Sequence, residues 1–184
     1  EGAPFPAFAA NTIVGGFDMT VEGVRYGRAF HFKTLEGKAV FVRGALAGEH
    51  VRAVRTTRHR QYDEARVDAV LAASPDRVEP RCVHFGTCGG CALQHLAPAA
   101  QIAAKARTLM ENLERIGHVR PGRELAPLAS EAWGYRRRAR LSVKRVDKKG
   151  RVLVGFREVD GRFVADIARC EVLLSFGVPP GVLG

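Results

Sequence analysis

The sequence predicts a β-rich α+β protein made of two small domains. Three observations predict this fold class: short β-type runs separated by glycines in residues 12–74, one amphipathic helical stretch after residue 98, and alternating runs between residues 135 and 167. The chain has 184 residues, of which 46% are hydrophobic, so it can build one or two small cores. Intrinsic disorder is therefore excluded as its main state.

The N-terminal domain is predicted to be a five-stranded barrel over residues 12–74, after a poorly ordered leader at residues 1–11. Its strands are expected at residues 19–24, 28–33, 38–42, 51–58 and 62–71. In the last strand, the residues expected to share one face are Ala65, Val67, Ala69 and Leu71. A barrel of this length is typical of oligonucleotide-binding (OB) folds, whose exposed face and loops bind single-stranded nucleic acid.

The predicted barrel contains candidate RNA-binding residues. Its basic residues include Arg43, Arg52 and Arg60, together with Arg55 and Arg58, which we single out as RNA contacts. Its candidate stacking rings are Phe30, Phe32 and Tyr62. The alternative is that these rings belong to the core and the arginines to a solvated face.

The second domain is expected over residues 80–175, after a linker marked by Pro75 and Pro80. Its helix is predicted to begin at Pro98 and to end at Gly117, because apolar residues recur between them at helical spacing. An antiparallel β-meander is predicted next, with strands at residues 135–146, 152–157 and 163–167.

Four cysteines form the most specific motif of the chain. Cys82, Cys88 and Cys91 have the spacing C-x5-C-x2-C, and Cys170 follows after 78 intervening residues. In a reducing compartment, this spacing favours metal or redox chemistry over structural disulfides. Zinc usually takes matched C-x2-C pairs, whereas an iron–sulfur cubane is often held by three clustered thiolates and a remote one. Spacing alone leaves zinc and an iron–sulfur cluster as equal alternatives.

The polar neighbours of these cysteines are expected to pack around the site rather than to bind metal. They are His84, Gln94 and His95. The predicted meander ends at Cys170, so its last strand is expected to bring the fourth thiol to the cysteine loop.

The basic residues are concentrated in the predicted hairpin of the meander. The chain has a formal net charge of +10, and residues 134–157 contain ten basic residues against one acidic residue, Asp147. If residues 135–146 form one strand, Arg136, Arg138, Arg140 and Lys144 share a face. We predict that these residues and Arg157 bind a phosphate backbone; the alternative is a solvated β-surface.

No membrane partner is predicted. No window approaches ~18 uninterrupted apolar residues, and the first twenty residues lack the basic and apolar regions of a signal peptide. The expected location is the cytoplasm.

Motifs along nearly the whole chain resemble those of bacterial RNA uracil-C5-methyltransferases, with the closest match to the 23S ribosomal RNA group that carries an N-terminal TRAM domain. The motifs are Cys82–His95, the helix with Gln101 and Lys105, Trp133–Leu141, Gly155–Arg157 and Asp166–Cys170. The resemblance implies that the four cysteines hold a [4Fe-4S] cluster and that the barrel is a TRAM domain. It further implies RNA as the partner, specifically 23S rRNA; the sequence does not determine the oligomeric state, and a monomer is the expectation. One departure from the family is the TRAM turn, often Gly-x-Gly, which here reads Tyr26-Gly27-Arg28.

The resemblance also implies a methyl-transfer reaction, and this chain lacks residues that the reaction requires. Enzymes of this family add a cysteine thiolate to uracil C6, so that C5 attacks the methyl group of S-adenosylmethionine. This requires a fifth cysteine and a nucleotide-binding α/β domain, but the sequence has four cysteines and no G-x-G. We therefore expect an N-terminal, RNA-holding part that has no catalytic residue and is inactive alone, with residues 176–184 as a tail toward an absent methyltransferase domain.

Two alternative functions remain open at this point. The first is a free-standing iron–sulfur or zinc RNA-binding module without catalysis. The second is a redox sensor whose cluster changes the affinity for RNA.

Overall fold

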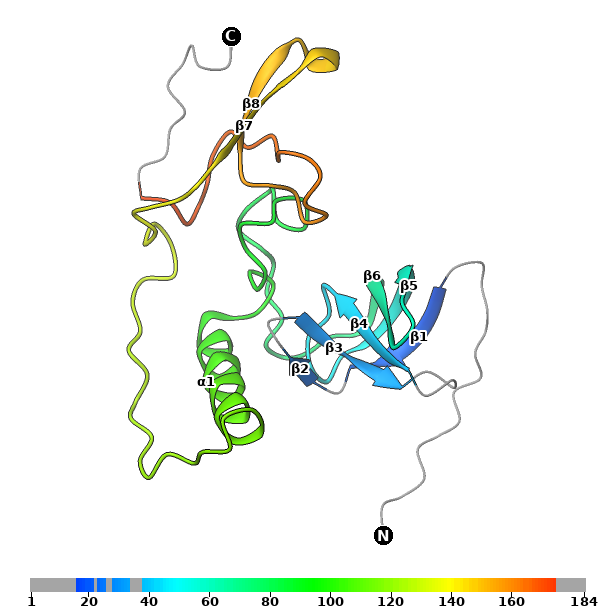
Figure 1. Ribbon diagram of the computed structural model, residues 1–184, viewed down its shortest axis with the longest axis vertical. Helices are drawn as coiled ribbons and strands as arrows, with labels where there is room; N and C mark the ends of the chain where they lie inside the picture. Colours follow the sequence, from blue (N-terminus) through cyan, green and yellow to red (C-terminus); the bar gives the residue numbers. More distant parts are fainter. Residues whose placement is uncertain (1–15, 22, 26–27, 34–37, 175–184) are drawn as a thin grey trace. The chain divides into compact units, whose positions relative to one another are not determined.

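The chain divides into two compact units, Glu1–Pro75 and Asp76–Gly184 (Figure 1). The structure, a computed structural model, describes residues 16–21, 23–25, 28–33 and 38–174. The predicted leader at residues 1–11, the tail at 176–184 and the turn at Tyr26-Gly27 lie outside the described residues. No helix of the described part is long and apolar enough to cross a membrane.

The first unit contains a six-stranded sheet with the order β1-β5-β6-β4-β3-β2. The strands are β1 (Gly16–Thr20), β2 (Gly23–Arg25), β3 (Arg28–Lys33), β4 (Ala39–Arg43), β5 (His50–Arg58) and β6 (Tyr62–Ala72). Strands β4 and β6 pair in parallel, and all other pairs are antiparallel.

The described strands form an open six-stranded sheet, and the predicted five-stranded OB-like barrel is not confirmed in this part of the chain. The strand predicted at residues 19–24 is divided between β1 and β2, which are the two edges of the sheet. The amide of Val21 still donates to the carbonyl of Glu49 at 2.8 Å beside β5, but from Gly23 the chain pairs with β3 instead. This change of partner turns one predicted strand into two.

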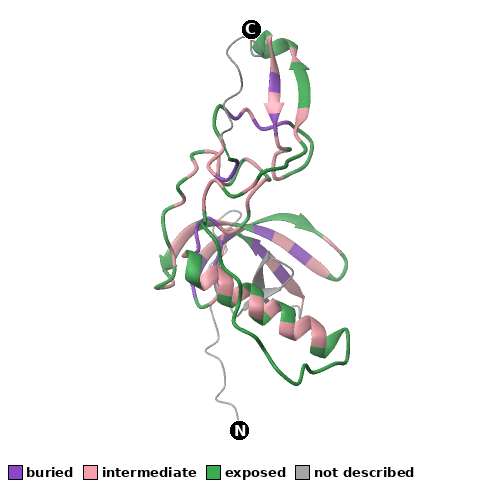
Figure 2. Cartoon of the chain, turned by 90° about the vertical axis from the view of Figure 1, so that its left-hand side faces the viewer, coloured by how far each residue is buried: buried purple, intermediate pink, exposed green. Residues whose placement is uncertain are grey.

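The core of the first unit lies on one face of this sheet. It consists of Met19, Val21, Val40, Val42, Ala45, Val51, Ala53 and Ala65. Figure 2 shows buried residues alternating along the strands, as the pleat requires. Apolar side chains at alternate positions of each strand thus point to the same side of the sheet, where they pack against those of the neighbouring strands.

Two irregularities in β6 change which of its side chains face this core. Arg52 pairs with Ala69 and Ala53 pairs with Val67, so Asp68 has no partner opposite it on β5. Leu71 likewise has no partner on β5. Each extra residue reverses the alternation of the faces. Val67 and Val70 therefore pack against the core while Leu71 is 44% exposed, which corrects the prediction that Leu71 shares the face of Ala65.

The described part of the second unit has one α-helix, as predicted, and a two-stranded sheet. The helix α1 (Pro98–Arg115) begins with a proline in its first turn, where the missing N–H costs nothing. It ends where the amides of Gly117 and Val119 donate to the carbonyls of Asn112 and Leu113, at 3.0 and 2.9 Å. None of its residues is buried, and Figure 2 shows it with only intermediate and exposed positions.

The β-meander is shorter than predicted. It consists of β7 (Ser142–Val146), a 3-10 turn η1 (Asp147–Lys149) and β8 (Arg151–Gly155), so residues 135–141 are not part of a strand. Strand β8 is too short to pair with them. The backbone of Arg136 instead bonds Val172 and Leu174, at 2.8 and 3.1 Å.

The third strand predicted for the meander is reduced to a single bridge between Arg157 and Val164. The flanking hydrogen bonds join Glu158 to Phe163 and Ala165 to Phe156, each at 2.9 Å. This bridge turns the chain after β8 back toward Cys170.

Candidate metal centre and nucleic-acid interface

The four cysteines line one small cavity in the second unit. Cys82, Cys88 and Cys91 come from the loop before α1, and Cys170 comes from the segment after the meander. All four are free thiols of intermediate exposure. The fold thus brings together the three clustered cysteines and the remote one.

Short-range hydrogen bonds shape the cysteine loop. The amide of Phe85 donates to the carbonyl of Cys82 at 3.0 Å, and the amide of Cys88 donates to the carbonyl of His84 at 2.8 Å. Gly86 lies between them with a φ of 86°, a conformation that favours glycine. These bonds form a tight turn, so the first two cysteines of the motif approach each other despite their spacing.

The loop packs directly against the chain that follows β8. The amide of Gly89 donates to the carbonyl of Arg157 at 2.9 Å, and a Cβ atom at Gly89 would lie 2.8 Å from that oxygen. A Cβ atom at Gly90 would lie 2.9 Å from the ring of Phe156, which also lines the cavity. The two glycines are therefore required for the close approach of these segments.

The surroundings of Cys88 favour its neutral thiol form. Burial raises the pKa of the Cys88 thiol, and the charges of Cys91, Cys170 and Cys82 raise it further. The amide of Gly90 opposes this by donating to Cys88 Sγ at 3.4 Å. Thiols that repel one another when charged become stable thiolates once a soft metal binds them.

Four thiols are the donor type that soft metals and iron–sulfur clusters take, but their spacing in the structure is not that of a single-metal site. Both are held by thiolates, and backbone N–H groups that point at sulfur are typical of cluster sites. Within the described residues, no group of three or more His, Cys, Asp or Glu side chains is gathered closely enough to hold a single metal ion.

The polar neighbours of the cysteines lie around the cavity, as expected. The side-chain oxygen of Gln94 accepts a hydrogen bond from the amide of Cys82 at 3.1 Å. The ring of His95 is buried and lies 5.3 Å from the ring of Phe85. His84 lines the cavity.

A cluster of charged and aromatic side chains at the cavity was not predicted from the sequence. The carboxylate of Glu171 binds Arg81 at 3.2 Å and Arg169 at 3.0 Å. The guanidinium of Arg81 also lies 5.3 Å from the centre of the Trp133 ring. The only available sequence signal was the position of Arg169 and Glu171 on either side of Cys170.

The predicted basic stripe is not a single strand face. Only Lys144 lies in β7, so strand alternation does not place Arg138 and Arg140 beside it. All three side chains are exposed, and within the described part of the chain they make no ion pair.

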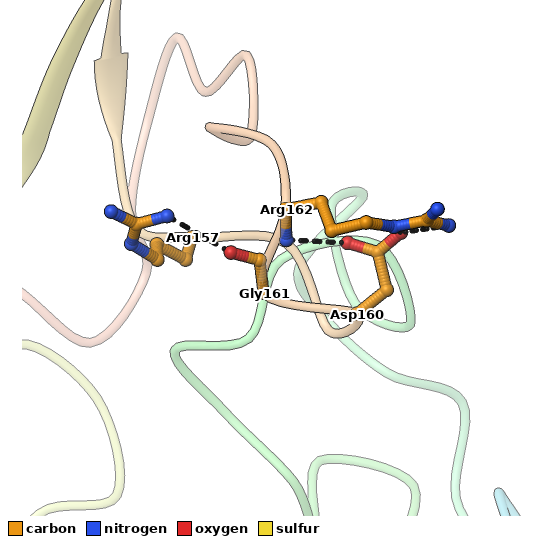
Figure 3. Close-up of polar contacts among 4 residues, drawn as sticks. All are labelled: Arg157, Asp160, Gly161 and Arg162. Carbon is orange, nitrogen blue, oxygen red and sulfur yellow. Dashed lines mark hydrogen bonds and ion pairs between the residues drawn. The ribbon is translucent and has the colours of Figure 1, made fainter.

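The other predicted RNA-binding residues of the meander are bound within the protein. The guanidinium of Arg136 lies 5.8 and 5.9 Å from the centres of the Tyr135 and Phe156 rings. Arg157 is exposed but donates to the carbonyl of Gly161 at 2.9 Å, at a turn where Asp160 also binds Arg162 (Figure 3).

Two cations near the tip of the β7–β8 hairpin share the single carboxylate of Asp166. Its carboxylate binds Lys149 at 2.9 Å and also binds Arg151. The hydrogen bond from Lys149 is the main reason why the pKa of Asp166 lies below its usual value, and the charge of Arg151 contributes. These two cations are therefore less available to an external phosphate than Arg138 and Arg140.

In the first unit, the two predicted RNA contacts lie at the same end of β5. Arg55 Nε is 2.9 Å from the fully buried carboxylate of Asp63, whereas Arg58 is exposed at the end of the strand. The ring of Tyr62 stacks on His59 at 4.3 Å, and the side chains of Phe30 and Phe32 lie outside the described part.

Comparisons with known proteins agree with this architecture. The chain is 63% identical over 138 residues to the 23S rRNA (uracil(1939)-C(5))-methyltransferase of Stenotrophomonas maltophilia. It is 59% and 58% identical, over the same length, to the enzymes of that name from Xylella fastidiosa and Xanthomonas oryzae. Over these 138 residues, the chain is therefore similar to enzymes named 23S rRNA uracil-C5-methyltransferases.

The matched region covers 75% of this chain and 31% of each of these relatives, so the chain spans about a third of their length. No protein-family model matches it. Among solved structures, it is similar to Pyrococcus abyssi tRNA (uracil-54, C5)-methyltransferase in complex with S-adenosyl-L-homocysteine. The TM-score is 0.52 at 24% identity, over 83% of this chain and 32% of that one, which is a likeness of fold.

Proposed function

We propose that this chain is the RNA-recognition part of an S-adenosylmethionine-dependent 23S rRNA uracil-C5-methyltransferase. The observation that carries the proposal is the identity of 57–63% over 138 residues to enzymes of that name. Methyl transfer itself would belong to the part of these relatives that the chain does not span. All four thiols of the chain line one cavity, so a thiolate that attacks uracil would come from that other part.

The four cysteines are the proposed ligands of a [4Fe-4S] cluster. Three observations support this: the shared cavity, the donation from Gly90 to Cys88 Sγ, and the close approach that Gly89 and Gly90 permit. A cubane with four thiolate ligands has no open iron, so it would supply a rigid cross-link between the loop and Cys170. We therefore assign it a structural role.

The exposed cations Arg138, Arg140 and Lys144 are the proposed contacts to the RNA backbone. Their charges are not neutralised by acidic residues in the described part of the chain, so phosphate binding would release counterions there. Arg136 is held by the Phe156 ring and would fix the start of the segment from which these cations project, whereas Arg157 is bonded to Gly161 in the turn after β8.

Metal analysis tests the cluster. Anaerobically purified chain is expected to be brown and to contain about four irons and four sulfides. Stoichiometric zinc without sulfide would overturn the cluster and favour a zinc-containing RNA-binding module.

RNA binding and methyl transfer test the function. A 23S rRNA fragment that contains the target uridine is expected to bind more tightly than tRNA at equal salt. The chain alone is expected to transfer no labelled methyl group from S-adenosylmethionine. Equal binding of both RNAs would remove the assignment to 23S rRNA, and methyl transfer would show that the chain is itself catalytic.

A further inference from the structure

We propose that the imidazole ring of His59 is a stacking platform for a nucleobase of single-stranded RNA. His59 lies in the turn between β5 and β6, outside the cysteine cavity and the basic segment at Arg138 and Arg140. The proposal rests on the proposed RNA-binding function and adds a base-binding residue in the unit Glu1–Pro75.

The first argument is a series of aromatic rings. The ring of Phe41 meets the ring of Tyr62 edge-on, with centres 5.2 Å apart and an angle of 90°. The ring of Tyr62 then stacks on that of His59, with centres 4.3 Å apart and an angle of 26°. Among the described residues, His59 is the last ring of the series, and a nucleobase would extend the stack by one more ring.

The second argument is that the platform is held in place by the protein. The amide of His59 donates to the carbonyl of Tyr62 at 3.0 Å, and Lys38 Nζ donates to the carbonyl of His59 at 3.0 Å. Lys38 Nζ also lies 3.9 Å from the fully buried carboxylate of Asp63. Both polar backbone groups of His59 are thus bonded, so little conformational freedom remains to be lost when a base binds.

The third argument is the charge around the turn. Residues 38–72 contain seven basic and four acidic residues, and two of the acidic ones, Glu49 and Asp63, are fully buried. Arg58 and Arg60, on either side of His59, are both exposed. Cations beside an aromatic ring fit a nucleotide, which offers a phosphate and a π-face together, better than an apolar protein segment.

The test is the affinity of the full chain for a fluorescein-labelled, single-stranded oligouridine of about 12 nucleotides, measured by anisotropy. His59→Ala is expected to weaken binding about 5- to 150-fold, the range for loss of one stacked base. His59→Phe keeps a ring and is expected to bind within about twofold of the wild type. The matched control His50→Ala, at the other end of β5, is expected to bind as the wild type does.

An oligonucleotide with abasic sites separates stacking from charge. The loss caused by His59→Ala is expected to disappear with abasic RNA, because the backbone remains and the rings do not. Equal losses with both oligonucleotides would overturn the platform. A 5-bromouridine RNA bound to the wild-type chain is also expected to photocrosslink to the β5–β6 turn, whether or not the variant folds; no crosslink there would overturn the proposal.

The binding data distinguish an error in the His59 proposal from an error in the proposed RNA-binding function. If His59→Ala binds as the wild type does while substitution of Arg138 and Arg140 weakens binding, the platform is wrong and the function stands. If the wild-type chain binds neither oligouridine nor the 23S rRNA fragment, both are wrong.

Discussion

Single glycines decide whether the cysteine loop can pack against the chain segment that follows β8. Gly89 is the sharpest case, because the atom that a Cβ would meet at 2.8 Å is the backbone oxygen of Arg157, which cannot rotate away. The pattern Cys-Gly-Gly-Cys therefore encodes a close approach as well as a flexible loop.

We predict that Gly89→Ala destabilises the second unit by about 1–3 kcal/mol, the usual cost of overpacking, and lowers the iron bound per chain. The matched control is Gly122→Ala, because a Cβ there meets no atom within 4 Å. Thermal unfolding and iron analysis of both variants check this. Equal stability and iron content in Gly89→Ala and the wild type would contradict the proposed packing.

A second prediction at this scale concerns pH. Because the folded state lowers the pKa of Asp166, its carboxylate adds stability above the ordinary pKa of 3.8, and this contribution is lost as the pH falls through the folded value. Asp166→Asn should therefore lower Tm at neutral pH by an amount that shrinks below about pH 4. Asp147→Asn, whose carboxylate is 93% exposed, serves as the control. If the Tm difference between Asp166→Asn and the wild type stayed the same from neutral pH to below about pH 4, the Lys149–Asp166 bond would be contradicted.

At the scale of elements, the segment before β7 differs most from its prediction. Arg136 is anchored by backbone bonds to residues 172 and 174 and by two aromatic rings, while Arg138 and Arg140 lie in the irregular stretch that leads to β7. These two exposed arginines project from a segment fixed at both ends rather than from a sheet surface.

We predict that replacing Arg138 and Arg140 together with Ala weakens RNA binding and reduces the slope of log affinity against log salt by up to about 1.4–1.8, as expected for two lost phosphate contacts. Arg162→Ala is the matched control, because Arg162 is exposed but bound to Asp160. Binding titrations at several salt concentrations provide the measurement. An unchanged slope would mean that this segment is a solvated surface.

At the scale of the whole molecule, the cavity and its four cysteines lie within Asp76–Gly184. The other unit has its own core around Val21, Val40 and Val51. The proposed cluster site and the sheet of the first unit are therefore built from separate parts of the chain.

We predict that removing the metal with a chelator under reducing conditions loosens the second unit and leaves the first folded. Amide hydrogen exchange should rise around Cys82–Cys91 and Cys170 but not in β5 and β6. Loss of protection in both units at once would show that the cluster supports the whole chain.

The sequence by itself determined the features that depend on near neighbours in the chain. It located β3–β6 within about one residue and predicted the helix from Pro98. It also grouped the four cysteines, which line one cavity in the structure. Spacing, local turn chemistry and helical periodicity are properties of a few consecutive residues, so they can be read without knowing the fold.

Only the tertiary structure decided which segments pair. It divided the first predicted strand between two edges of an open sheet, and it turned Leu71 outward through irregular pairing of β5 with β6. It also replaced a continuous strand at Arg136 with a bridge to the segment that follows Cys170. Each outcome depends on competition between distant backbone partners, and alternation within one strand carries no information about that competition.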